Sequence, residues 1–96
     1  MELKQAFGAV LKRARSVQGK TQEDFSVVSS RTYLSSLERG VYSPTVDKVD
    51  ALASVLGLHP LTLMASCYLR AQPELGVDAL LERLRGELEI LRGGER

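Results

Sequence analysis

The stretch SSRTYLSSLERG, residues 29–40, decides the fold of this 96-residue chain. Its two leucines, Leu34 and Leu37, are three positions apart, so they lie on one face of a helix. The side chains expected off that face are small and polar or cationic: Arg31, Thr32, Ser35 and Ser36. This combination predicts a helix that packs through a narrow apolar stripe and offers its remaining surface to a polar partner.

Apolar residues recur at helical spacing along almost the whole chain, and no strand pattern stands out. We expect helices over residues 2–18, 22–28, 30–39, 45–56, 60–69 and 77–91. Gly19, Gly40 and Gly57 follow three of them, as is usual at helix ends, and Pro60 suits the first position of another. The chain is therefore expected to be all-α, with a domain over 1–70, a linker over 71–76, an amphipathic helix over 77–92 and a tail over 93–96.

The inward side of each expected helix follows from the same spacing. The residues expected to be buried are Leu3, Phe7, Val10, Leu11, Ala14, Phe25, Val28, Val46, Val49, Leu52, Ala53, Leu56, Leu61, Met64, Ala65 and Tyr68. Cys67 is read as a small buried thiol, because a redox sensor needs an exposed and acidified thiolate. With few aromatic residues and no tryptophan, the core should be aliphatic.

Composition and charge exclude several classes of protein. No apolar run is long enough to span a membrane, and the start, MELKQAF, lacks the apolar block of a signal peptide, so a cytoplasmic protein is expected. One cysteine and one histidine argue against a zinc site, and no cofactor is expected. Residues 1–44 hold seven Lys/Arg and four Asp/Glu, whereas residues 45–96 hold six and eight. This basic front half favours contact with a polyanion.

Two short helices joined by a tight turn, the second polar and outward-facing, are the parts of a helix-turn-helix. The major groove of B-DNA admits one α-helix. A helix that reads it needs apolar anchors on its inner side, here Leu34 and Leu37, and compact hydrogen-bonding side chains outside. The residues therefore indicate binding to double-stranded DNA.

The segments TQEDF, SSRTYLSSLERG and SPTVDKVDALASVLGL together resemble the Cro/C1-type (XRE-like) helix-turn-helix family of bacterial and phage regulators. The resemblance covers residues 3–69 and implies a five-helix lambda-repressor-like domain. The chain departs from the family between its second and third helices. The segment SVVSS is about two residues shorter than usual and has no glycine. Its length affects the geometry of the turn and hence the orientation of the third helix.

The resemblance implies roles for individual residues. Those matching base-reading positions are Arg31, Thr32 and Ser36. Those matching or neighbouring phosphate-binding positions are Thr21, Gln22, Ser30, Tyr33, Ser35, Arg39, Tyr42 and Ser43. Arg15 and Glu38 match a structural ion pair between the first and third helices. Alternatives stay open for some: Arg31 gripping phosphate only, Gln22 as an ordinary exposed residue, and Arg39 as a solvated helix-end cation.

A row of apolar residues along 77–91 has the spacing of two heptads: Val77, Leu81, Leu84, Leu88 and Leu91. We expect it to pair with its copy in a homodimer; packing back on its own domain is the alternative. The function expected is that of a homodimeric regulator, most simply a repressor, on a near-palindromic operator. The rivals are an antitoxin that also binds a toxin, a controller protein of a restriction–modification operon, and a protein-interaction module without DNA binding. An enzyme is the least expected reading.

Overall fold

The computed structural model describes residues 1–93, so the expected tail lies outside the described residues at positions 94–96. The helical elements, in chain order, are α1 (Leu3–Val17), η1 (Gln22–Phe25), α2 (Arg31–Glu38), α3 (Val46–Leu56), α4 (Pro60–Ala71) and α5 (Val77–Gly93). The part of the chain described contains no strand, which confirms the all-α prediction.

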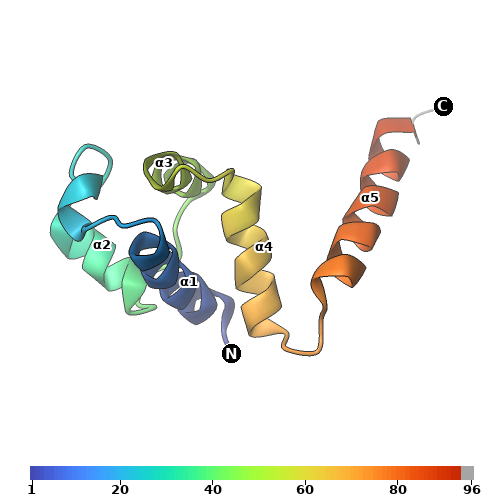
Figure 1. Ribbon diagram of the computed structural model, residues 1–96, viewed down its shortest axis with the longest axis horizontal. Helices are drawn as coiled ribbons and strands as arrows, with labels where there is room; N and C mark the ends of the chain where they lie inside the picture. The colour runs from blue at the N-terminus through green and yellow to red at the C-terminus, as the bar shows by residue number, and fades with distance from the viewer. Residues whose placement is uncertain (94–96) are drawn as a thin grey trace.

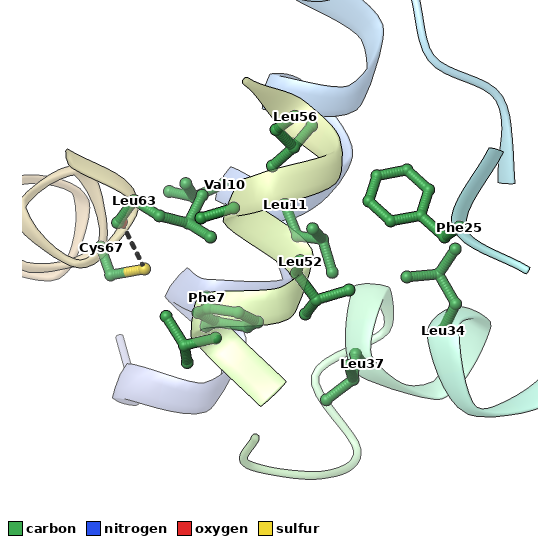
Figure 2. Close-up of a cluster of buried hydrophobic side chains, with 12 residues drawn as sticks. Phe7, Val10, Leu11, Phe25, Leu34, Leu37, Leu52, Leu56, Leu63 and Cys67 are labelled. Atoms are coloured by element: carbon green, nitrogen blue, oxygen red, sulfur yellow. Dashed lines mark hydrogen bonds between the residues drawn. The ribbon is translucent and has the colours of Figure 1, made fainter. Parts of the chain in front are cut away.

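The core lies where α1, α2, α3, α4 and η1 meet (Figure 1). Phe25 from η1 faces Leu34 from α2, while Leu11 and Leu52 approach from α1 and α3 (Figure 2). On the side of α4 the core is completed by Leu63 and by Cys67, whose thiol donates to the Leu63 carbonyl oxygen at 3.2 Å. This packing, aliphatic except for Phe7 and Phe25, contacts α2 through Leu34 and Leu37.

The α-helix expected over residues 22–28 is wrong. Only a single 3-10 turn, Gln22–Phe25, forms there, and a turn over residues 26–28 follows it. The amides of Val28 and Ser29 both donate to the Phe25 carbonyl oxygen, which closes that turn. Val27 is 86% exposed, so beyond Phe25 little apolar surface is buried that would extend the helix.

Three details of the expected core are also wrong. Leu3, the first residue of α1, is 39% exposed. Val46, the first residue of α3, is 86% exposed. It lines a shallow apolar pocket at the surface and does not reach the core. In α4 the buried residues are Leu63 and Cys67, while Leu61 is 68% exposed and Tyr68 is exposed. Apolar residues occur on almost every face of α4, so its inward face is fixed by packing against α1 and α3 rather than by spacing.

The helix α5 lies apart from this core. None of its residues is buried, and in Figure 1 it stands beyond α4, at the opposite end of the long axis from α2. A turn after α4, in which the Leu75 amide donates to the Gln72 carbonyl oxygen, reverses the chain between the two helices. The molecule extends 46 Å along its longest axis, and α2 and α5 lie at its two ends.

Candidate nucleic-acid interface

The helix α2 exposes its first turn. Leu34 and Leu37 are fully buried and face the core (Figure 2). Arg31 and Thr32, in the first turn, are exposed. Ser30 precedes the helix in extended conformation, and its hydroxyl oxygen accepts a hydrogen bond from the Tyr33 amide at 3.1 Å. This cap fixes where the helix begins. The first two helical residues thus project from a defined helix end into solvent.

Ser36 does not have the position expected of a base-reading residue. It is only 7% exposed, and its hydroxyl oxygen accepts a hydrogen bond from Arg39 Nη2 at 3.3 Å. The expectation that Ser36 faces outward is therefore wrong. Positions one and two residues away do not share the face of Leu34 and Leu37, so the burial of Ser36 comes from the groups that cover its side of α2, among them the Arg39 side chain.

A polar network joins α1, η1 and α2. Arg15 donates from Nε to Glu38 Oε2 at 2.7 Å and from Nη2 to Glu38 Oε1 at 3.2 Å. Gln22 Nε2 donates to the same Oε1 at 3.1 Å, and the Gln22 amide oxygen accepts from Ser35 Oγ at 3.4 Å. Hydrogen bonding to Glu38 raises the pKa of Arg15 further above its ordinary value, against a smaller opposing effect of burial. The ion pair expected from the sequence is thus present, and it also holds Gln22.

A shallow polar cleft of about 270 Å³ opens beside this network. Its lining carries three cationic side chains, one carboxylate and two neutral polar residues: Lys12, Arg15, Arg39, Glu38, Gln22 and Ser35. Because Glu38 neutralises Arg15, Lys12 and Arg39 leave the cleft positive. Lys12 had no role in the sequence-based reading. Its signal was its position three residues before Arg15, on the same side of α1.

Two tyrosines and a lysine stack beside α2. The rings of Tyr33 and Tyr42 are 6.0 Å apart between centroids and inclined by 21°. Lys48 Nζ lies 5.5 Å from the Tyr33 ring centroid and donates a hydrogen bond to the Val28 carbonyl oxygen. Tyr42 and the neighbouring Ser43 are exposed after the end of α2. Sequence reasoning gave no role to Lys48, since its contacts span 15 and 20 positions along the chain.

The residue before η1 serves as its cap. The Thr21 amide and hydroxyl both donate to Asp24 Oδ2, at 2.8 and 3.2 Å. The hydrogen bond from the backbone amide is the main reason why the pKa of Asp24 lies below its usual value. In this arrangement the Thr21 hydroxyl proton points to Asp24, so its oxygen can only accept from a further partner.

The apolar row of α5 is open to solvent. Its members are 40% to 77% exposed: Val77, Leu81, Leu84, Leu88 and Leu91. The same helix carries two exposed ion pairs, Arg83–Glu87 at 2.9 Å and Glu82–Arg85 at 3.9 Å. A contiguous apolar row of this kind marks an interaction surface more often than bare solvent contact.

The structure also bears on metal binding, membrane spanning and thiol chemistry in residues 1–93. In that span no group of three or more His, Cys, Asp or Glu side chains is placed to hold a metal ion. No single helix there is long and apolar enough to cross a membrane; α3 and α4 reach that length only together, bent by 104° at their break. Burial raises the pKa of Cys67 to about 11, which makes it a poor nucleophile at neutral pH.

A capped helix anchored by two leucines, with exposed polar residues in its first turn and cations at its flank, defines a DNA-binding helix-turn-helix protein. A family model described as helix-turn-helix matches residues 11–63. The chain belongs to the Cro/C1-type helix-turn-helix family of bacterial and phage transcriptional regulators. It is accordingly a DNA-binding transcriptional regulator.

Two relatives support this membership. The chain is 39% identical to the uncharacterized HTH-type transcriptional regulator y4dJ of Sinorhizobium fredii over 66 residues. The aligned region covers 67% of this chain and 86% of that protein. The fold of this chain is similar to the crystal structure of the clp gene regulator ClgR from Corynebacterium glutamicum, with a TM-score of 0.68 and 25% identity over 93% of both chains. The likeness to ClgR extends over most of α5 as well as the domain, since so little of either chain is left out.

Proposed function

We propose that this regulator is a homodimeric repressor that binds a near-palindromic operator, inserting α2 of each subunit into the major groove. The observation that carries the proposal is the exposed first turn of α2, held from behind by Leu34 and Leu37. Because residues near the start of a recognition helix make most base contacts, Arg31 and Thr32 are assigned to base reading. Ser36 is left out of this assignment, since it is buried.

Arg31 carries most of the discrimination in this proposal. A guanidinium can donate two parallel hydrogen bonds to O6 and N7 of guanine, a contact worth about 1–3 kcal/mol against the wrong base. Thr32 can touch a thymine methyl group with its own methyl. Both side chains are exposed.

In this proposal, the polar cleft and the loop after α2 contact the phosphate backbone of the DNA. Lys12 and Arg39 supply positive charge, and Gln22 retains a second amide hydrogen beyond the one given to Glu38. Tyr33, Tyr42, Ser43 and Ser30 complete the set of proposed phosphate contacts. Thr21 and Ser35 are left out, because their hydroxyl protons are given to Asp24 and Gln22 and a phosphate oxygen needs a donor. Since phosphate contacts release counterions, affinity should fall steeply as salt rises.

The exposed row of α5 supports the proposal of a dimer. Its apolar spacing fits a two-stranded coiled coil, with charged residues at the rim. Because α5 and α2 lie at opposite ends of the subunit, the angle between the two subunits decides how far apart their α2 helices fall. Half-sites must nevertheless be separated by a whole number of helical turns of about 34–36 Å. Repression is proposed over activation because occluding a promoter requires no contact with polymerase.

Selection of bound sequences from random DNA, combined with measurement of the solution mass, tests this proposal. The wild type should select an inverted repeat and have twice the 10.5 kDa chain mass. Leu84→Glu with Leu88→Glu should give a monomer that binds weakly, because two charges would enter the apolar row. Ala79→Glu, on the opposite side of α5, is the matched control and should remain dimeric.

Distinct results would overturn each part of the proposal. A wild type that binds no DNA at low salt would remove the base-reading role of α2. A monomeric wild type that selects a single half-site would remove the dimer. If α5 instead forms a stable stoichiometric complex with a second protein encoded beside it, the antitoxin reading replaces the homodimer.

A further inference from the structure

We propose that Lys48 is a positioning residue that sets the orientation of α2 relative to the rest of the domain, and thereby the sequence selectivity of the protein. This inference rests on the proposed base reading by α2. It concerns a residue outside α2, on α3, that has no place in the base-reading or phosphate-binding sets above. The short segment before α2 creates the need for it, because residues 26–29 form a tight turn without glycine.

One ammonium group connects the segments on both sides of the start of α2. Lys48 Nζ donates to the carbonyl oxygen of Val28, which lies in the turn before the helix. The same Nζ lies over the ring of Tyr33, which belongs to the first turn of the helix. Tyr33 in turn stacks on Tyr42 in the loop that follows the helix. The turn, the helix and the following loop are therefore tied to α3 through a single side chain.

The turn has few other restraints. Among the described residues, Lys48 supplies the one recorded side-chain hydrogen bond to residues 26–28. The rest of the turn is held by backbone hydrogen bonds to Phe25 and by packing of the half-buried Val28 side chain against the core, so Lys48 is the polar link between the turn and α3. Lys48 is itself well anchored, because its amide donates to the Thr45 hydroxyl that caps α3 and its side chain is partly buried.

The orientation of α2 matters more for reading bases than for binding the DNA backbone. A bidentate hydrogen bond from Arg31 to a guanine demands a fixed direction and distance. Contacts to phosphate depend chiefly on charge and tolerate small displacements. Loosening the start of α2 should therefore lower the preference for the operator while leaving binding to unrelated DNA almost unchanged.

The test compares Lys48→Met with Lys12→Gln on the selected operator and on a scrambled duplex of the same length. Methionine keeps an unbranched stem but removes the charge and the donor. We expect Lys48→Met to lower the operator-to-scrambled affinity ratio about tenfold, the size of one lost base contact, with the salt dependence unchanged. Lys12→Gln should weaken both duplexes alike and reduce the salt slope by about 0.9. Lys48→Arg, which restores charge and donor, should recover most of the ratio.

A measurement on the free protein separates this inference from the proposed function. In Lys48→Met the amides of residues 28–33 should exchange with deuterium faster, while those of Val10 and Leu11 in the core of α1 exchange as in the wild type. In the wild type, the ε-methylene protons of Lys48 should be shifted upfield by the Tyr33 ring, and Tyr33→Leu should abolish the shift.

Three results would overturn the assignment. The first is an unchanged affinity ratio in Lys48→Met with a wild type that does select an operator. The second is an equal loss on both duplexes with a smaller salt slope, which would make Lys48 an ordinary phosphate contact. The third is the absence of the ring-current shift in the wild type, which decides the matter even if Lys48→Met fails to fold. A wild type that selects no operator would instead refute the proposed function.

Discussion

Arg15 and Glu38 join α1 to the last turn of α2 through two hydrogen bonds, of 2.7 and 3.2 Å. The Glu38 side chain is only 6% exposed, so its charge depends on Arg15 and on the Gln22 amide for compensation. The pair thus couples the stability of the domain to the placement of α2.

Replacing Arg15 by methionine should destabilise the fold by about 3 kcal/mol, because it leaves a nearly buried carboxylate without its cation. The free energy of unfolding in urea measures this. Arg83→Met is the matched control: Arg83 and Glu87 are largely exposed, so its loss should cost less than about 0.5 kcal/mol. The double variant Arg15→Met/Glu38→Met should be more stable than Arg15→Met. If it is not, the unpaired charge is not the cause.

Gly8 permits α1 and α2 to approach closely. A Cβ atom there would lie 2.4 Å from the Leu37 carbonyl oxygen and 2.7 Å from that of Glu38. Both are backbone atoms, so Gly8→Ala should force the helices apart and cost about 1–3 kcal/mol. Gly86 in α5 has no such neighbour within 4 Å. Gly86→Ala should instead stabilise α5 by about 1 kcal/mol, because alanine has the higher helix propensity, and so raise the helix content. Circular dichroism and thermal unfolding of both variants check the contrast; equal destabilisation would contradict it.

Arg31→Ala should broaden the range of selected sequences while retaining much of the affinity for unrelated DNA. The physical reason is that a base contact discriminates among sequences, whereas a phosphate contact does not. Repeating the selection from random DNA with Arg31→Ala and with Lys12→Gln measures the difference. An unchanged consensus for Arg31→Ala would show that Arg31 only grips phosphate.

Cys67 should be unreactive in the folded protein and should make folding sensitive to high pH. Burial raises the pKa of this thiol from its ordinary 9.0 to about 11. Between these values the unfolded chain loses the proton and the folded chain keeps it, so stability falls as pH rises, by at most about 1.4 kcal/mol per pH unit. Urea unfolding at pH 8 and 10, compared with Cys67→Ala, isolates this contribution. At pH 8, labelling by a disulfide reagent should proceed at the rate of unfolding, and rapid labelling would contradict the burial.

Much of the domain could be predicted because its signals are local. Leu34 and Leu37 are three residues apart, Ser30 stands where a cap belongs, and Gly40 adopts the positive φ of 76° that ends α2. Each of these depends on residues within one or two turns. The errors arose where local signals were evenly balanced. α4 has apolar residues around most of its surface, and the turn after η1 holds Val27, which the fold leaves 86% exposed.

The sequence by itself determined the order of the helices, the burial of Val10, Leu11, Leu34 and Leu37, and the pattern of the helix-turn-helix. It could do so because propensity, capping and periodicity act between near neighbours. Only the tertiary structure decided the inward face of α4, the burial of Ser36, and the bridge from Lys48 to Val28 and Tyr33. Those features depend on which segments the packing brings together. The contact from Lys48 to Val28 spans 20 positions, a distance over which no local pattern carries information about direction.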